Sequence, residues 1–446
     1  MKFTKIAVAV ALAFAFGNAY AFHDGGVAYC DGCHTMHNSS GNKAMAKKGA
    51  STQFQGLNYL LQGSDDSSTC LNCHAAADAP GKPSGYLIMT YPAPAAGTAP
   101  TERTPGGDFA WLTQTYTAKG SRGQTISSIG ERHGHNVVAA DYGLVADATL
   151  TTAPGGQYSA SALSCASCHD PHARARVVDA NGTIAYPKLG SATLPTDGSG
   201  SYGGQASAGV YAVGVYRILA GSNYSQMSYS NPLAFNADPP VAVAPSTYNT
   251  STAATGGVRV AYGKGMSEWC SNCHRSIHND NVNASNTQLI HPAGNGALLT
   301  ATANDLQGNA AGTTIAAIYN AYKKSGDLTN TQASSFNSTV PYEAGTGVVA
   351  TLVALQASAG GPSTGTENVM CLSCHRAHAG GFPNMGRWYF QGGMITENGA
   401  WPDAAASSDY SAGLPQTVYA AAMYDQSATN YAYAQRSLCN KCHAKD

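Results

Sequence analysis

Six copies of the pattern C-x-x-C-H are the part of this sequence best suited to chemistry. We number them motifs 1 to 6 in chain order: Cys30–His34, Cys70–His74, Cys165–His169, Cys270–His274, Cys371–His375 and Cys439–His443. The pattern is typical of covalent attachment of a c-type haem. Its two thiols add to the two vinyl groups of the porphyrin, and the adjacent His reaches the iron as the proximal ligand.

The cysteine count supports this interpretation, because six motifs of two cysteines use all twelve that the chain contains. A zinc ribbon or a thioredoxin-like site also uses C-x-x-C, but neither requires His at the next position. We therefore predict six covalently bound haem c groups, each with its iron. The predicted thioether residues are Cys30, Cys33, Cys70, Cys73, Cys165, Cys168, Cys270, Cys273, Cys371, Cys374, Cys439 and Cys442. The predicted proximal iron ligands are His34, His74, His169, His274, His375 and His443.

The number of histidines outside the six proximal ones predicts a second histidine ligand on every iron. Six bis-histidine irons need six distal ligands, and eight histidines remain outside the proximal set. The ten methionines show no repeated relation to the motifs. The distal candidates are His23, His37, His135, His172, His278, His291 and His378. Seven candidates stand for six positions, so one of them is not a ligand, and the sequence does not say which.

Four of these candidates follow a proximal histidine closely: at three positions after it in motifs 1, 3 and 5, and at four in motif 4. On a helix, such a pair lies on one face about a turn apart. Two imidazoles so placed cannot bind opposite faces of one porphyrin. We therefore expect the second imidazole to bind a different haem, which brings neighbouring haems into near contact.

The remaining histidines lie on longer connectors. The local assignments are His135 to motif 3, which follows it, and His291 to motif 4, which precedes it. His133 lies two positions before His135, so we expect it to be a solvent-exposed histidine without a ligand role.

The first 21 residues have the pattern of a secretory signal peptide: a charged start, an apolar run and a small-residue end. We expect cleavage before Phe22 and export across the inner membrane, with residues 22–446 forming a single hexahaem cytochrome c unit. No later segment approaches the roughly 20 apolar residues of a membrane span. The cleavage site carries no Cys for a lipid anchor.

The composition predicts a chain wrapped on its cofactors rather than several ordinary domains. The sequence has 50 Gly, only 11% charged residues and long Ala/Ser/Thr/Gly tracts. Such a chain has little apolar area with which to offset its ordering entropy. Six large apolar porphyrins can supply the missing core as one line of haems. Residues 314–324 show the clearest helical pattern, with apolar residues at helical spacing and a Gly just past the end.

The charge argues against a nucleic-acid partner. The formal net charge is −1, and removing the two lysines of the leader makes it −3. Haem propionates add negative charge. Nucleic-acid binding depends on neutralising phosphates with positive charge, so this class of function is excluded. A low charge on the polypeptide also weakens self-repulsion and permits self-association.

With these motifs, the sequence resembles the OmcS-type hexahaem outer-surface cytochromes of Geobacter-like bacteria, which polymerise into extracellular filaments. The resemblance covers nearly all of the chain after the leader. It is carried by GGVAYCDGCHTMHN (25–38), TPGGDFAW (104–111), GHNVVAADY (134–142), CASCHDPH (165–172), VAPSTYN (243–249), RVAYGKGMSEWCSNCH (259–274), HPAGNGA (291–297), YKKSGDLTNTQAS (322–334), CLSCHRAHA (371–379) and LCNKCHAKD (438–446).

The resemblance implies a fold of mostly coil with short α-helices and very little sheet. It implies six bis-histidine haems in one continuous chain of stacked and perpendicular pairs that replaces the hydrophobic core. It also implies that protomers join end to end, with His37 ligating the haem at Cys371 and Cys374 of the next protomer. The implied partners are further copies of the chain, other outer-membrane cytochromes, and extracellular metal oxides or electrodes.

Two other function classes are alternatives to a filament-forming cytochrome. A multihaem reductase needs an iron with an open position, often marked by Lys as proximal ligand, whereas all six motifs here end in His. We therefore expect no enzyme activity. A monomeric periplasmic shuttle is compatible with the motifs, although transient redox partners usually steer by charge, which this chain lacks.

Overall fold

The computed structural model describes residues 30–34, 39–40, 43–44, 60–75, 87–172, 177–179, 181–185, 216, 218–226, 233–243, 259–278, 291–302, 312–322, 332–406 and 409–443. Most of these residues lie in turns and coil. The α-helices are α2 (Cys30–Cys33), α3 (Asp66–His74), α4 (Met266–Cys270), α5 (Ile315–Ala321), α6 (Val349–Gln356) and α7 (Gln416–Ala422). The mostly coil fold with short helices is confirmed.

The sheet content is limited to four two-stranded antiparallel hairpins within the described ranges. They pair β1 (Ser39–Ser40) with β2 (Lys43–Ala44), β3 (Tyr116–Lys119) with β4 (Thr125–Ser128), β5 (Val177–Val178) with β6 (Ile184–Ala185), and β7 (Val241–Val243) with β8 (Ala261–Lys264). The β3–β4 register places Tyr116 opposite Ser128. Hairpins this small have no sheet face on which to build a domain.

The predicted helix at residues 314–324 is present as α5. Thr314 is its N-cap and accepts a hydrogen bond from the backbone N–H of Ala317 (3.2 Å). Ile318 and Tyr319 form its buried face. The helix ends at Ala321, three residues earlier than predicted, and the buried Tyr322 is its C-cap.

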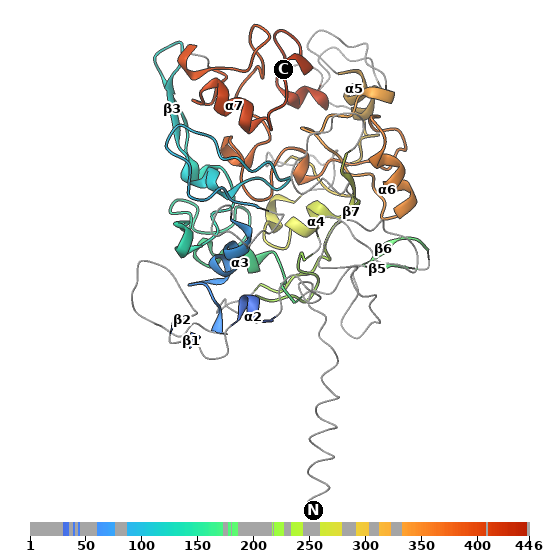
Figure 1. The fold of residues 1–446 in the computed structure, drawn as a ribbon. Helices are drawn as coiled ribbons and strands as arrows, with labels where there is room; N and C mark the ends of the chain where they lie inside the picture. The colour runs from blue at the N-terminus through green and yellow to red at the C-terminus, as the bar shows by residue number, and fades with distance from the viewer. Residues whose placement is uncertain are drawn as a thin grey trace, which may run out of the picture.

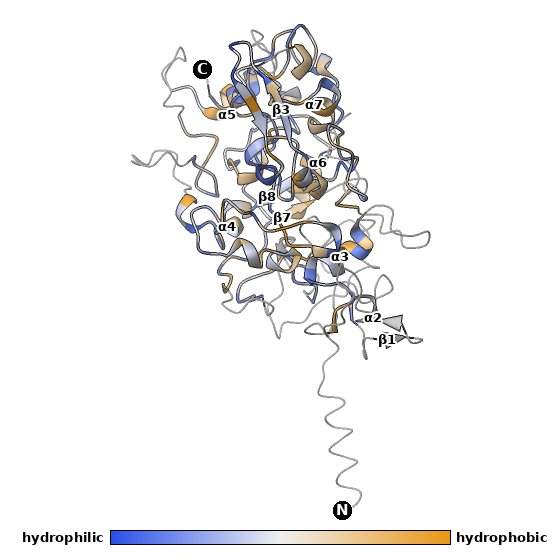
Figure 2. Cartoon of the chain, turned by 90° about the vertical axis from the view of Figure 1, so that its left-hand side faces the viewer, coloured by the Kyte–Doolittle hydropathy of each residue, from blue (hydrophilic) through white to orange (hydrophobic). Residues whose placement is uncertain are grey.

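The first and last described helices lie at opposite ends of the molecule. Figure 1 shows α2 and α3 near one end and α5 and α7 at the other. Hydrophobic residues are spread through the coil rather than confined to a few long elements (Figure 2). Among the described residues, no helix combines the length and apolar character needed to cross a bilayer.

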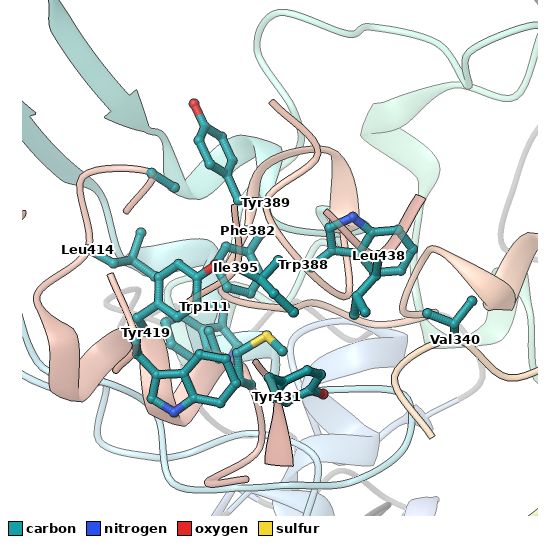
Figure 3. Packing of buried hydrophobic residues seen from close by; sticks show 14 of the residues in the cluster. Trp111, Val340, Phe382, Trp388, Tyr389, Ile395, Leu414, Tyr419, Tyr431 and Leu438 are labelled. Carbon is teal, nitrogen blue, oxygen red and sulfur yellow. The ribbon is translucent and has the colours of Figure 1, made fainter. Parts of the chain in front are cut away.

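An aromatic cluster near the C-terminal end is larger than the composition suggested. Aromatic residues are only 9% of the chain, but many of them gather here. The cluster includes Trp111, Phe382, Trp388, Trp401, Tyr419 and Tyr431 (Figure 3). Cys374 of motif 5 and Cys439 and Cys442 of motif 6 pack against it. The polypeptide therefore supplies part of the core around the last two motifs by itself.

A buried lysine ties motif 6 to α5. Lys441 is 2% exposed, and its Nζ donates to the backbone carbonyls of Tyr319, Tyr322 and Ser335, each at 2.9 Å. The ammonium group also lies 3.9 Å from the centre of the Tyr319 ring. All three N–H donors of the ammonium are therefore satisfied in the interior.

Lys441→Met should lower the stability of the haem-loaded protein by about 2–4 kcal/mol, because three buried carbonyls lose their donor. The matched control is Lys119→Met. Lys119 lies in β3 and its ammonium group donates to the exposed Thr125 hydroxyl (2.9 Å), so this change should stay within about 0.5 kcal/mol. Thermal unfolding measures both. Equal melting temperatures for the two variants would contradict the structural role of Lys441.

Candidate haem-binding site

Each C-x-x-C-H motif forms about one helical turn. In motifs 3 to 6 the backbone N–H of the histidine donates to the carbonyl of the first cysteine, at 2.9–3.1 Å. Motifs 1 and 2 belong to α2 and α3, and motif 4 begins at the end of α4. One turn brings the two sulfurs and the imidazole to one side of the backbone. None of the cysteines from Cys33 onward forms a disulfide. This arrangement suits two thioether bonds and one iron ligand.

The motifs come together as neighbours in the order of the sequence. A hydrogen bond with Cys165 raises the pKa of the Cys70 thiol, and Cys33 lies close enough to add to that shift. Motifs 1, 2 and 3 therefore lie next to one another. A hydrogen bond with Cys371 likewise raises the pKa of the Cys270 thiol, so motif 4 lies against motif 5.

Buried cysteines also place motif 3 near motif 4 and motif 5 near motif 6. Burial raises the pKa of Cys168, and the nearby Cys273 adds to the shift, so motif 3 lies near motif 4. Burial also raises the pKa of Cys374, and Cys442 contributes, so motif 5 lies near motif 6. The attachment sites therefore follow one another from motif 1 to motif 6.

Two buried serines join the adjacent motifs in the same way. The N–H of Cys165 donates to Ser67 Oγ, and the N–H of Cys371 donates to Ser267 Oγ, both at 3.1 Å. Each serine is fully buried and lies three residues before the first cysteine of its own motif, motif 2 or motif 4. The sequence analysis did not predict these serine contacts, although both serines share the spacing Ser-x-x-Cys with the first cysteine of their motif.

Four proximal histidines face four distal candidates. The pairs and their ring-centre distances are His34–His172 (6.3 Å), His135–His274 (6.1 Å), His169–His378 (6.3 Å) and His291–His443 (6.0 Å). A metal–imidazole bond of about 2.0–2.1 Å on each side, plus the distance from ring nitrogen to ring centre, gives roughly 6 Å. The gap in each pair therefore has the width of one six-coordinate iron. The residues present fit bis-histidine haem.

Hydrogen bonds hold several of these rings in the tautomer that binds iron through Nε2. Nδ1 of His135 lies 2.7 Å from the carbonyl oxygen of Ala377, and Nδ1 of His274 lies 2.8 Å from that of Pro154. His375 and His291 make the same kind of bond, to the carbonyls of Asn384 (2.8 Å) and Pro292 (2.9 Å). A proton on Nδ1 leaves Nε2 free for the metal.

Burial keeps the distal rings neutral. It lowers the pKa of His135 to about 4, with a contribution from His274. It lowers the pKa of His378 to about 3, with a contribution from His169. Neutral imidazole is the form that ligates a metal, so these rings need lose no proton to bind iron near neutral pH. The Phe109 ring stacks on His378 with a centre distance of 4.7 Å and fixes its plane.

The predicted cross-motif use of the histidines at +3 agrees with the geometry. His172 follows motif 3 but faces the proximal histidine of motif 1, and His378 follows motif 5 but faces that of motif 3. Neither lies against the proximal histidine of its own motif. A proximal histidine and the histidine three positions after it therefore lie at two different haem sites.

The local assignments of the connector histidines were wrong. His135 lies beside His274 of motif 4 and not beside the proximal histidine of motif 3. His291 lies beside His443 of motif 6 and not beside the proximal histidine of motif 4. For His135, the reason is a long-range backbone contact that proximity in sequence cannot reveal. The N–H of His135 donates to the carbonyl of His378 (2.9 Å), which holds the 135 segment against the chain that follows motif 5.

His133 is not the solvent-exposed residue that we predicted. Its side chain is 0% exposed, and its ring nitrogens lie 2.6 Å from Ser128 Oγ and 2.9 Å from the carbonyl oxygen of Trp111. Both nitrogens are therefore engaged by the protein. The predicted absence of a ligand role fits the geometry, but the reason is burial and hydrogen bonding rather than exposure.

His278 is the candidate that the described residues do not bring to a proximal histidine. Its Nε2 lies 3.9 Å from Glu268 Oε1, at the end of the turn that follows motif 4. The other two candidates, His23 and His37, lie outside the described residues. The distal ligands of motifs 2 and 5 therefore remain predictions.

His133→Ala and His135→Ala form a matched pair of neighbouring substitutions. His135→Ala should open one iron, so that the reduced variant binds about one carbon monoxide per chain, with loss of one low-spin haem signal. His133→Ala should leave all haems low-spin and lower stability by about 1–3 kcal/mol, because two buried partners lose their bond. Carbon monoxide binding by the His133 variant would contradict the assignment.

Comparison with known proteins identifies the family. No protein-family model matches the chain. The chain is 48% identical over 460 residues to the C-type cytochrome OmcS of Geobacter sulfurreducens, covering 100% of this chain and 99% of that protein. Two solved structures, the Outer Membrane Cytochrome S filament and the OmcS nanowires of the same organism, match with TM-scores of 0.78 and 0.77. Each is 47% identical and is covered completely by 95% of this chain. The resemblance found in the sequence is confirmed, and the chain belongs to the OmcS family of c-type cytochromes, which bind haem c covalently.

Proposed function

We propose that this protein is an extracellular electron-transfer cytochrome that holds six haem c groups and polymerises end to end. It passes electrons to acceptors outside the cell, such as metal oxides or electrodes, and receives them from other outer-membrane cytochromes. The relatives support this proposal, because the matching structures are a filament and nanowires. The observation in this chain that carries it is the set of four histidine pairs about 6 Å apart.

The histidine pairs support a protein that carries electrons rather than one that transforms a substrate. When bound, each haem supplies an iron that changes by one electron. A histidine on each side would leave the iron no coordination position for a small molecule. The burial of these rings and their hydrogen bonds to backbone carbonyls keep the two ligands fixed, so the site needs little rearrangement when its charge changes.

The pairs follow a rule that extends beyond one chain. The histidine at +3 in motif 3 serves motif 1, and that in motif 5 serves motif 3. By the same step of two motifs, motif 5 would need a histidine from a seventh motif. Motif 1 of a second copy can supply it, because it carries His37 at +3. We therefore assign His37 to the motif 5 haem of the neighbouring protomer.

The connector histidines follow a second rule. His135 precedes motif 3 and serves motif 4, and His291 precedes motif 5 and serves motif 6. His23 precedes motif 1, so the same rule assigns it to motif 2. Each pair of motifs, with its connector histidine and its histidine at +3, then forms one of three equivalent units. Both rules together use six distal ligands and leave His133 and His278 aside.

The shape of the molecule supports end-to-end assembly. The α2 helix, with motif 1, lies near one end, and α5 and α7 lie at the other (Figure 1). In this proposal, the end of one copy that carries motif 1 meets the part of the next copy that carries motif 5. In this proposal residues 1–21 direct export through the periplasm, and residues 22–446 form the single hexahaem unit that assembles at the outer surface.

His37→Ala should abolish filaments while leaving six attached haems per chain, because the junction loses its iron–histidine bond. Electron microscopy of material sheared from cells, together with the mass of the chain, measures both effects. The matched control is His278→Ala, which should form filaments of normal length. Long filaments of the His37 variant would rule out ligation between protomers and leave a monomeric shuttle as the better account.

The reduced filament should bind no carbon monoxide, because both axial positions of all six irons are closed by histidine. The visible spectrum before and after exposure to carbon monoxide measures this. Binding of one carbon monoxide per chain would show an open iron and would favour a multihaem reductase instead.

A further inference from the structure

Glu343 is a buried acid fixed between the segments that carry motifs 4 and 5. Its side chain is 1% exposed. Oε1 accepts the backbone N–H of Met266 at 2.9 Å, and Oε2 accepts Nδ2 of Asn368 at 2.8 Å. Met266 begins α4, which leads into motif 4, and Asn368 lies three residues before motif 5. The carboxyl group therefore belongs to the framework of both attachment sites.

The backbone of Glu343 makes this position rigid. Its N–H donates to the carbonyl of Asn368 (3.1 Å), and the N–H of Asn368 donates back to the carbonyl of Glu343 (3.0 Å). The first cysteines of motifs 4 and 5 are hydrogen-bonded to each other in the same region. A change of charge on either haem would thus occur beside a carboxyl group that cannot move away.

No cation compensates this carboxyl group within the part of the chain that the structure describes. Both of its hydrogen-bond donors are neutral amides, and no ion pair there includes it. Burial, the largest cause, raises the pKa of Glu343 to about 7, and Glu268 adds to the shift. The protonated and ionised forms therefore have similar free energies near neutral pH.

The titratable groups around Glu343 come from several segments. They are Glu268 and Cys270 of α4 and motif 4, Cys371 of motif 5, Tyr262 of β8, and Tyr216. Cys270 and Cys371 carry no charge once they are thioethers. The burial of Glu343 and the Glu268 carboxyl group then remain as the causes of its raised pKa.

We propose that Glu343 is a redox-linked proton site, which takes up one proton from water when the haem at motif 4 or motif 5 is reduced by one electron and releases it when that haem is oxidised. One electron enters and one proton binds the Glu343 carboxylate, so the local charge stays balanced. The electron comes from the proposed electron flow through the protein. This inference rests on the proposed haem attachment at motifs 4 and 5.

The physical basis is electrostatic. An electron adds negative charge near a second negative charge in a medium of low dielectric constant, where the repulsion is far stronger than in water. Protonation of Glu343 removes that repulsion. By linkage, the reduction potential must then fall as the pH rises across the titration of Glu343. The fall is at most about 59 mV for each tenfold change in proton concentration for a one-electron couple.

A second buried glutamate provides the matched control. Burial acts on Glu367 too, but the N–H groups of Ser363 and Thr364 outweigh it and hold the pKa of Glu367 below its ordinary value. Glu367 is 2% exposed. It lies next to Asn368, in the segment that leads into motif 5. It stays ionised near pH 7 and should take no part in proton uptake.

The test compares wild type, Glu343→Gln and Glu367→Gln, each shown by mass to carry six haems. Electrochemical reduction near pH 7 with a pH indicator measures protons taken up per chain. Glu343→Gln should take up fewer protons than wild type, by up to one per chain, and its potentials should depend less on pH between 6 and 8. Glu367→Gln should behave as wild type. Equal uptake by Glu343→Gln and wild type would overturn the proposal.

A spectroscopic measurement keeps the test valid if Glu343→Gln fails to fold. Infrared difference spectra of reduced minus oxidised wild type, with ¹³C-labelled glutamate, should show the C=O band of a protonated carboxylic acid appearing on reduction. Absence of that band near pH 7 would also overturn the proposal. Fewer than six haems in the wild type would instead count against the proposed function, so the two failures are distinguishable.

Discussion

In the proposed function, the bond between iron and two histidines is the constraint on which the rest of this structure depends. The described pairs join parts of the chain that are far apart in sequence; His169 and His378, for example, are separated by 209 residues. Closing such loops costs entropy, and short helices and two-stranded hairpins cannot repay that cost. A metal bond that exists only in the folded state contributes its binding free energy to folding. Coil can therefore be the dominant structure of a stable protein.

The same constraint organises the small interactions around it. Backbone carbonyls orient the rings of His135 and His274, and serine hydroxyls hold consecutive motifs against each other. Lys441 fastens motif 6 to α5, and the aromatic cluster packs against motifs 5 and 6. Each of these contacts positions a cofactor ligand or its attachment site. The fold thus supports the cysteines and histidines of the motifs through separate local contacts along the chain.

Much of this was predictable from the sequence because the motif itself carries the chemistry. Twelve cysteines and six proximal histidines follow from a local pattern, and the pairing of His172 and His378 with other motifs follows from the steric impossibility of sandwiching one haem. The partners of His135 and His291 could not be predicted, because they depend on contacts between distant segments. The burial of His133 was missed for the same reason: Trp111 and Ser128 reach it through the fold.

The most direct test of this account is a cryo-EM map of the haem-loaded protein at a resolution that separates the axial side chains. The account predicts iron between His34 and His172, His135 and His274, His169 and His378, and His291 and His443, with His37 of the next protomer on the motif 5 haem. A map in which His278 or a water molecule occupies any of these axial positions would contradict it.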